Sequence, residues 1–321
     1  MSISHLKAIL ATIEQEDYPV HSRVHKLHQT DCYVKREDEL GCILSGSKIR
    51  KYRSLIPHLK QKGVKKLALI GSQYSNHILG LSSLLIENQI APELFLLKSH
   101  DQELVGNALF THLLVPKAQI HYIERAMWPH VHDIASKTGL EVIPEGGATK
   151  ECLPGLLTLP LDIIANEQSL GLQFAHILID SGTGITAAAL IACFGLLLKR
   201  VTVHVMLAAG TVAEFHERVI EAKNALGILV KQEVSLLPEY VLHAPPVAKS
   251  FGATSEGIFA TIKEVGQKEG IFLDPIYSSK LYLLQKKLLE QKVLSSPVLL
   301  IHSGGVFSLA GFQNRLIGVP G

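Results

Sequence analysis

The sequence predicts an α/β protein built on parallel β-sheets with helices on both faces. After about residue 60, short apolar runs alternate with longer segments of helical periodicity, which is the pattern of βαβ units. Several of the apolar runs end in glycine beside hydroxyl or amide residues, as strands do where they enter a loop. The 321 residues, 47% of them hydrophobic, suffice for roughly two domains with a large core.

The first part of this alternation runs from residue 66 to residue 143. The segment Lys66-Leu67-Ala68-Leu69-Ile70 predicts a buried strand, because it is short, apolar and followed by Gly71. Further strands are predicted at residues 93–97, 120–123 and 141–143, and helices at residues 75–88, 103–114 and 128–137.

A second series begins at about residue 150. Strands are predicted at residues 176–179, 201–206 and 298–301, and helices at residues 152–168, 185–199, 212–226, 255–267 and 279–291. No repeat, low-complexity tract or linker divides the chain. We therefore expect two closely packed α/β lobes.

Charge and composition exclude several classes of partner. Lys and Arg number 31 and Asp and Glu 29, so the net charge is +2, which offers no electrostatic footprint for nucleic acid. The longest apolar stretch, residues 184–198, is shorter than the roughly 20 residues that span a bilayer, and residues 1–17 contain no signal-peptide core. The cysteines at positions 32, 42, 152 and 193 show no C-x-x-C spacing, and no H-E-x-x-H motif occurs. We expect a cytoplasmic protein without a metal site, a membrane partner or a nucleic-acid partner.

Four predicted strands lead into loops rich in glycine and hydroxyl groups. These loops are residues 71–76, 146–149, 181–186 and 303–305. Each pattern alone is an ordinary turn, but parallel strands bring such loops to one edge of a sheet, where ligands bind.

The loop Ser181-Gly182-Thr183-Gly184-Ile185-Thr186 offers backbone N–H groups and hydroxyls at the start of a predicted helix. A helix N-terminus of this kind binds phosphate without a Lys or Arg. No G-K-[ST] or G-x-G-x-x-G motif is present, so a P-loop or a dinucleotide site is disfavoured. The pattern fits the single phosphate of a small cofactor best.

Lys48 follows the small-residue turn Ser45-Gly46-Ser47 at the predicted start of a helix. The helix dipole, and the desolvation of a cofactor pocket, both disfavour the ammonium form and lower the pKa toward that of a nucleophile. Arg50 and Lys51 also fit a solvated helix start. A lysine amine and a loop that binds a single phosphate are the smallest set of groups that can hold pyridoxal 5′-phosphate covalently on a protein.

Ordered motifs across most of the chain resemble the pyridoxal-phosphate-dependent 1-aminocyclopropane-1-carboxylate deaminase and D-cysteine desulfhydrase family. They include K-R-E-D at residues 35–38, G-S-K-I-R-K at 46–51, L-I-P at 55–57, S-N-H at 75–77, P-E-G-G at 144–147, T-G-I-T at 183–186, L-D-P-I-Y at 273–277 and H-S-G-G at 302–305. The similarity spans about residues 30 to 310.

The resemblance implies a fold-type-II enzyme, related to the tryptophan synthase β chain, that forms a homodimer. It implies two open twisted parallel-sheet domains with helices on both faces: residues 1–51 plus 156–321 as a large cofactor-binding domain, and residues 52–155 as a smaller inserted domain. It places the cofactor linkage on Lys48 and the phosphate on Thr183, Gly184, Ile185 and Thr186. It further places Asn76 on the phenolic oxygen, Tyr277 against the ring, and the Ser303 hydroxyl at the ring nitrogen. A hydroxyl partner is expected to leave that nitrogen largely unprotonated.

The resemblance also implies the reaction and its substrate class. Lys48, Ser75 and Tyr277 are the expected catalytic residues, and Ser75, Asn76, His77, Tyr74, Ala148 and Thr149 the expected substrate contacts. Ser278 stands where the deaminase branch carries Glu, so β-elimination from D-cysteine to pyruvate, ammonia and sulfide is favoured. A cyclopropane-opening deaminase and a cofactor-binding protein with little activity remain alternatives. Tyr74, Leu79-Gly80 and Ala148-Thr149 depart from the family pattern, which bears on the choice of the small amino-acid substrate and on the strength of the activity.

Overall fold

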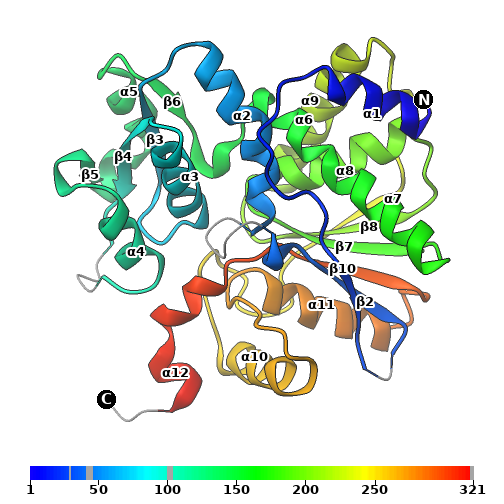
Figure 1. Cartoon of the computed structure of the whole chain (residues 1–321). Coiled ribbons are helices and arrows are strands. Elements are labelled where there is room, and N and C mark those ends of the chain that lie inside the picture. Colours follow the sequence, from blue (N-terminus) through cyan, green and yellow to red (C-terminus); the bar gives the residue numbers. More distant parts are fainter. Residues whose placement is uncertain (29, 41–45, 100–103, 319–321) are drawn as a thin grey trace.

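The structure is a computed structural model that describes residues 1–28, 30–40, 46–99 and 104–318. Within these residues the strands form two sheets, one of six strands and one of four. Figure 1 shows the two sheets in separate lobes, with helix α2 (Ile49–Gln61) running between them. Cys42 and residue 103, where a helix was predicted to start, lie outside the described residues.

The larger sheet has the strand order β1-β2-β10-β7-β8-β9. All of its neighbours are parallel except β1 and β2. In that order the strands are Val24–Lys26, Cys32–Arg36, Val298–His302, His176–Ser181, Thr202–Leu207 and Tyr240–His243. The sheet is therefore not wholly parallel, because the hairpin β1-β2 adds an antiparallel edge.

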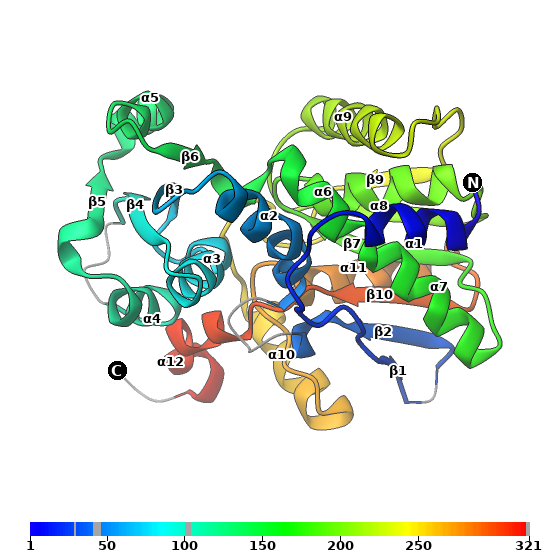
Figure 2. The same cartoon turned by 45° about the horizontal axis from the view of Figure 1, so that its top comes forward.

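Helices cover both faces of this sheet (Figure 2). One face packs under α1 (Ile3–Ala11), α6 (Leu153–Leu156), α7 (Thr158–Leu170), α8 (Ile185–Leu196) and α9 (Val212–Val230). The other face packs on α10 (Glu256–Glu269) and α11 (Ser278–Glu290), with α12 (Gln313–Ile317) at the C-terminal end. Almost every residue of α8 is buried, which explains why this helix has no polar face.

The smaller sheet is entirely parallel and has the order β5-β4-β3-β6. Its strands are Ile120–Ile123, Ala91–Leu97, Lys66–Ser72 and Glu141–Ile143, and its helices are α3 (Asn76–Glu87), α4 (Asn107–Leu114) and α5 (Val131–Ser136). This sheet lies wholly inside residues 52–155. We keep the division into an inserted lobe, residues 52–155, and a lobe formed by residues 1–51 and 156–321 as a proposal.

The predicted α/β class is confirmed, and the differences are local. The predicted helix 152–168 is two helices, and the segment 128–137 starts as a 3-10 helix around Pro129, which cannot donate a helical hydrogen bond. The patterns did not predict β1, β2 and β9. Strand β2 is fully buried although it ends in Lys35 and Arg36, because both cations are paired with carboxylates. Among the described residues, no helix is long and apolar enough to cross a bilayer.

Candidate active site

Lys48 is the residue immediately before α2, the helix that runs between the two lobes in Figure 1. A short 3-10 helix, Gly46–Lys48, presents it. The Ser47 backbone N–H donates to the carbonyl oxygen of Ser303 at 3.0 Å, which ties this turn to the end of β10. A Cβ on Gly46, whose φ is +48°, would lie 2.7 Å from that same oxygen, so the turn requires glycine.

The Lys48 amine has no hydrogen bond or ion pair within the described part of the chain. Burial lowers its pKa, and the carboxylates of Asp180 and Asp274 oppose that shift from nearby. An unpaired, partly desolvated amine is costly for a fold to keep unless it serves chemistry. Lys48 therefore stays the candidate nucleophilic lysine of the site.

The predicted phosphate loop connects β7 to α8. Gly184 is the N-cap of α8 with φ +84°, and the N–H groups of the first helical turn have no helical acceptor. Across the junction, a Cβ on Gly146 would lie 2.6 Å from Cγ2 of Thr183. The loop 144–147 of the smaller lobe therefore closes directly onto the phosphate loop, and glycine leaves the room for it.

Ser75 and Asn76 form the start of α3. Ser75 is the N-cap, and its Oγ accepts from the backbone N–H groups of His77 (3.1 Å) and Ile78 (3.4 Å). The Oδ1 of Asn76 accepts from Nδ2 of Asn107 at 2.7 Å. A Cβ on Gly305 would lie 2.8 Å from Asn76 Nδ2, so Asn76 reaches the loop after β10. The fold thus brings Asn76 close to the segment that carries Ser303.

His77 is buried under this helix start. Its Nδ1 lies 2.9 Å from the Tyr52 hydroxyl, and its Nε2 is buried without a partner among the described atoms. Burial lowers the pKa of His77 well below its usual value, assisted by the charges of Lys51 and Lys48. The imidazole is therefore neutral, with one ring nitrogen free to bond a ligand.

The remaining predicted substrate contacts lie in two loops beside α3. The Tyr74 carbonyl oxygen accepts from Asn107 Nδ2 at 2.9 Å. Thr149 Oγ1 lies 3.5 Å from Cys152 Sγ, and Ala148 packs against the main core. These side chains come from the carboxyl ends of β3 and β6, as the parallel-sheet argument expects.

Tyr277 precedes α11 and faces the phosphate loop. A Cβ on Gly182 would lie 3.5 Å from the Tyr277 hydroxyl oxygen. The Asp274 carboxylate accepts from the backbone N–H groups of Tyr277 (3.0 Å) and Ser278 (2.8 Å), which fixes the start of the helix. Burial raises the pKa of Tyr277, so its phenol stays protonated.

Ser303 is at the end of β10, and its hydroxyl donates to Asp180 Oδ1 at 2.9 Å. Asp180 lies on the neighbouring strand β7, and burial raises the pKa of its carboxyl group. Sequence reasoning did not single out Asp180. Asp180 is the one acidic residue of an otherwise apolar strand, directly before the phosphate loop. An acidic side chain in such a strand usually has a specific partner, and this was the signal that could have identified it.

Lys51 and Arg50, which also fitted a solvated helix start, are both buried. Lys51 Nζ donates to the Gly146 carbonyl oxygen at 3.0 Å, which links α2 to the loop of the smaller lobe. Burial and the neighbouring Lys48 lower the pKa of Lys51 to about 8. Lys51 is therefore a second amine close to the phosphate loop.

The K-R-E-D motif and Arg50 form a buried ion network behind Lys48. The Arg50 guanidinium donates to both carboxylate oxygens of Glu37 (2.6 and 2.8 Å) and to Asp162 (2.9 Å). Lys35 pairs with the same Asp162, and Ser22 donates to Glu37 at 2.6 Å. This network fixes the first turn of α2 to β2 and α7, and so fixes the position of Lys48.

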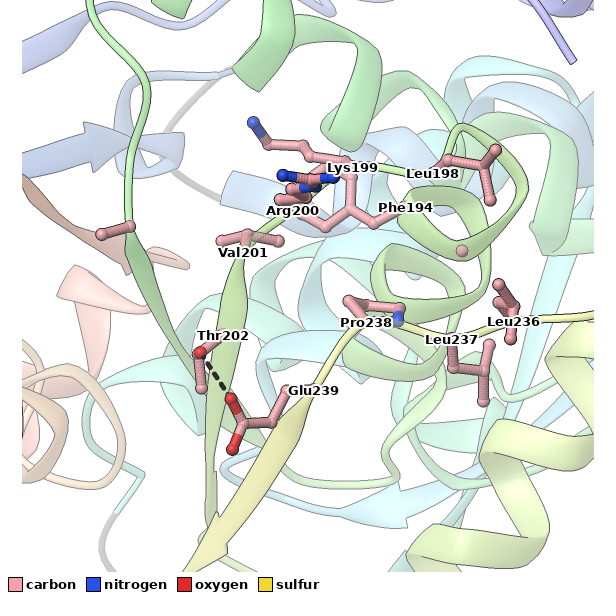
Figure 3. A pocket seen from close by; sticks show the side chains of 12 residues that line it. Phe194, Leu198, Lys199, Arg200, Val201, Thr202, Leu236, Leu237, Pro238 and Glu239 are labelled. Atoms are coloured by element: carbon pink, nitrogen blue, oxygen red, sulfur yellow. Dashed lines mark hydrogen bonds between the residues drawn. The ribbon is translucent and has the colours of Figure 1, made fainter.

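A separate pocket of about 520 Å³ lies at the amino ends of β7 and β8 (Figure 3). It is lined by Phe194, Leu198, Arg200, Thr202 and Glu239 among others, and Thr202 Oγ1 donates to Glu239 Oε2 at 2.9 Å. Because the phosphate loop follows the carboxyl end of β7, this pocket is at the opposite edge of the sheet from Lys48.

The sequence of the chain is similar to those of known enzymes over most of its length. No protein-family model matches the chain. It is 26% identical over 318 residues to a D-cysteine desulfhydrase of Serratia proteamaculans, covering 92% of each chain. It is 25% identical over 309 residues to a 1-aminocyclopropane-1-carboxylate deaminase of Rhizobium leguminosarum, covering 89% of each.

Solved structures give the same result for the fold. A homologue of 1-aminocyclopropane-1-carboxylate deaminase superposes with a TM-score of 0.81 at 23% identity, covering 99% of both chains. Diaminopropionate ammonia lyase of Escherichia coli, solved with a pyridoxal-phosphate reaction intermediate, superposes with a TM-score of 0.64 at 13% identity, covering 99% of this chain and 92% of that one.

The fold is that of the fold-type-II pyridoxal-phosphate enzymes, as predicted. Within this class the chain is a homologue of the 1-aminocyclopropane-1-carboxylate deaminases and D-cysteine desulfhydrases, and the resemblance in the motifs is confirmed.

Proposed function

We propose that this protein holds pyridoxal phosphate on Lys48 and catalyses β-elimination from a small amino acid, D-cysteine being the favoured substrate. The observation that carries the proposal is the Lys48 amine, unpaired among the described residues and near Asp180, which lies on β7 just before the loop 181–186. Gly46, Gly146 and Gly305 let the loops that carry Ser303, Thr183 and Asn76 approach one another closely, so the candidate donors for the cofactor lie in adjoining segments.

Each residue has a distinct role in holding the cofactor. Lys48 supplies the covalent link, and the first-turn N–H groups with the Thr183 and Thr186 hydroxyls take the phosphate. Asn76 is the donor for the phenolic oxygen, Tyr277 covers the ring and Ser303 meets the ring nitrogen. Once bound, pyridoxal phosphate withdraws electrons from the substrate Cα, which makes the Cα proton removable.

The protein then moves the proton and holds the substrate. The Lys48 amine would be the base that removes the Cα proton, because burial lowers its pKa. Ser75, at the positive end of α3, binds the substrate carboxylate, with Tyr74, His77, Ala148 and Thr149 around the side chain. Overall, D-cysteine and water give pyruvate, ammonia and hydrogen sulfide.

Two alternatives remain. In a cyclopropane-opening deaminase we expect Glu at position 278; here Ser278 Oγ donates to Asp274 Oδ1 at 3.1 Å and so belongs to the helix cap. A cofactor-binding protein with little activity is the other alternative. Tyr74, Leu79-Gly80 and Ala148-Thr149 differ from the family pattern. These differences favour neither the deaminase nor the binding protein over elimination, but they bear on which amino acid fits the site.

Reconstitution with pyridoxal phosphate tests the cofactor proposal. We expect an absorption band at about 410–430 nm, typical of the cofactor linked to a lysine, and expect Lys48→Ala to abolish it. Lys62→Ala, at the exposed end of the same helix, is the control and should keep the band. A colourless wild-type protein after cofactor addition would contradict the proposal.

Product assays separate the three activities. Pyruvate and sulfide released from D-cysteine support elimination, 2-oxobutanoate from 1-aminocyclopropane-1-carboxylate supports the deaminase, and a visible band without turnover of any D- or L-amino acid supports the binding protein. With elimination, Lys48→Ala should lower turnover by at least ~10³-fold, as the loss of a nucleophile and base does.

We also propose that the enzyme is a cytoplasmic homodimer. Sedimentation equilibrium of the holoenzyme tests the dimer, and the mass of a single chain would refute it.

A further inference from the structure

The hydroxyl of Ser303 is already committed to a carboxylate. Ser303 Oγ donates to Asp180 Oδ1 at 2.9 Å, between the ends of the neighbouring strands β10 and β7. A serine hydroxyl carries one proton and has lone pairs that can only accept. While that proton is held by Asp180, Ser303 can meet a ring nitrogen only as an acceptor, and the nitrogen must then carry a proton.

The charges around Asp180 favour the same arrangement. Asp180 lies near a second carboxyl group, that of Asp274, and near the Lys48 amine. His302 lies beside the same carboxyl groups; its Nδ1 accepts from the Gly304 N–H at 3.3 Å, and its Nε2 lies 2.8 Å from the Phe272 carbonyl oxygen. Lys48 and His302 both oppose the rise in the pKa of Asp180 that burial causes. The carboxyl groups of Asp180, which is partly buried, and of Asp274, which is buried, favour a positive charge beside them.

We propose that Asp180 is a positioning residue that holds the Ser303 proton, so that Ser303 accepts a hydrogen bond from a protonated pyridine nitrogen. This inference rests on the proposed function and reverses the expectation that a hydroxyl partner leaves the ring nitrogen unprotonated. A protonated ring withdraws electron density from the substrate Cα more strongly than a neutral ring. Asp180 therefore tunes the electron demand of the site without touching the substrate.

Nitrogen NMR of the holoenzyme tests this directly, without a measurement of activity. The protein is reconstituted with pyridoxal phosphate labelled with ¹⁵N in the ring, and the ring resonance is compared with those of protonated and unprotonated pyridoxal phosphate at neutral pH. We expect the protonated position in the wild type. Asp180→Asn removes the charge, and its Nδ2 can donate to Ser303 Oγ, which frees the Ser303 proton for the ring nitrogen. The resonance should then move to the unprotonated position.

Two further variants separate the proposed route from a general charge effect. Ser303→Ala removes the accepting oxygen and should shift the resonance in the same direction, and Asp180→Asn should add little in the Ser303→Ala background. Glu145→Gln is the control, because Glu145 is an exposed carboxylate that acts on Tyr277 but not through Ser303, and it should leave the resonance in place.

An unprotonated ring in the wild type overturns the inference, and so does an Asp180→Asn resonance that matches the wild type. Should Asp180→Asn fail to fold, Ser303→Ala decides alone, and an unchanged resonance there refutes the inference. Failure of the proposed function is a different result: no visible band and no retained label, seen before any nitrogen shift is measured.

Discussion

At the scale of single residues, the buried charges behind Lys48 are the most consequential feature. Arg50 and Glu37 are both fully buried, and each makes two hydrogen bonds to the other. Removing one partner of such a pair leaves an uncompensated charge in a low dielectric. The network therefore makes α2 start where it does, and it makes the position of Lys48 sensitive to residues that never touch a ligand.

Replacing Arg50 by Met should lower the free energy of unfolding by about 3–5 kcal/mol, because Glu37 loses its cation and Asp162 keeps only Lys35. The matched control is Arg23→Met: Arg23 also binds one carboxylate, Glu39, through two hydrogen bonds, but its side chain is 57% exposed. We expect a loss below about 1 kcal/mol there. Urea unfolding monitored by circular dichroism measures both, and equal losses would refute the assigned role of burial.

At the scale of elements, the site depends on how closely α2 approaches α6. Gly155 in α6 lies against the backbone of α2, and a Cβ there would lie 1.9 Å from the Arg50 carbonyl oxygen. Its N–H donates to Ser54 Oγ at 3.1 Å, which joins the two helices by a hydrogen bond. The separation of these helices is thus set by the absence of one side chain.

Gly155→Ala should therefore push α2 away from α6, destabilise the protein by at least ~2 kcal/mol and weaken cofactor binding, as overpacking against a backbone does. Gly257→Ala in α10 is the control, because nothing lies within 4 Å of its Cβ position. There the usual helix preference of alanine should stabilise slightly, by up to about 1 kcal/mol. Thermal unfolding and a cofactor titration test both variants; a Gly155→Ala protein as stable as the control variant would contradict the packing argument.

At the scale of the whole molecule, three histidines form a line across the larger sheet. His204 Nε2 lies 3.0 Å from His176 Nδ1, and His204 Nδ1 lies 3.0 Å from His243 Nε2. Burial, with the charges of His243 and His176, lowers the pKa of His204 to about 4. Burial also lowers the pKa of His176, which Glu239 opposes, and burial together with the charge of Lys287 lowers the pKa of His243. The line is therefore stable only while its central ring is neutral.

This line predicts a loss of stability in mild acid. In the unfolded chain His204 takes up a proton near pH 6.5, but in the folded protein only near pH 4. Between these values the unfolded state binds more protons, so stability falls as the pH falls, by about 3 kcal/mol in total for this residue. Below about pH 4 this residue adds no further loss.

His204→Gln should flatten the stability profile between pH 6.5 and pH 4, while the exposed His5→Gln should leave it as in the wild type. Urea unfolding at several pH values gives the comparison. His77, whose pKa is also lowered by burial, contributes equally to all three proteins and cancels. Parallel profiles for wild type and His204→Gln would show that the line of histidines does not set the acid sensitivity.

The sequence by itself determined the α/β class and the loops at the carboxyl ends of the strands, and it singled out Lys48 as the candidate nucleophile. Apolar periodicity and the positions of glycines are local properties, so they can be recognised from the sequence alone. Lys48 could likewise be identified from the turn that precedes it and the predicted start of a helix. The partners of buried charges are not local. Lys35 and Asp162 are 127 residues apart, and Ser303 and Asp180 are 123 apart. Only the tertiary structure decided that Arg50 and Lys51 are buried and that the Ser303 hydroxyl donates to a carboxylate. The reason is that the order of strands in the sheet, and not the spacing in the sequence, sets which groups share a low-dielectric interior.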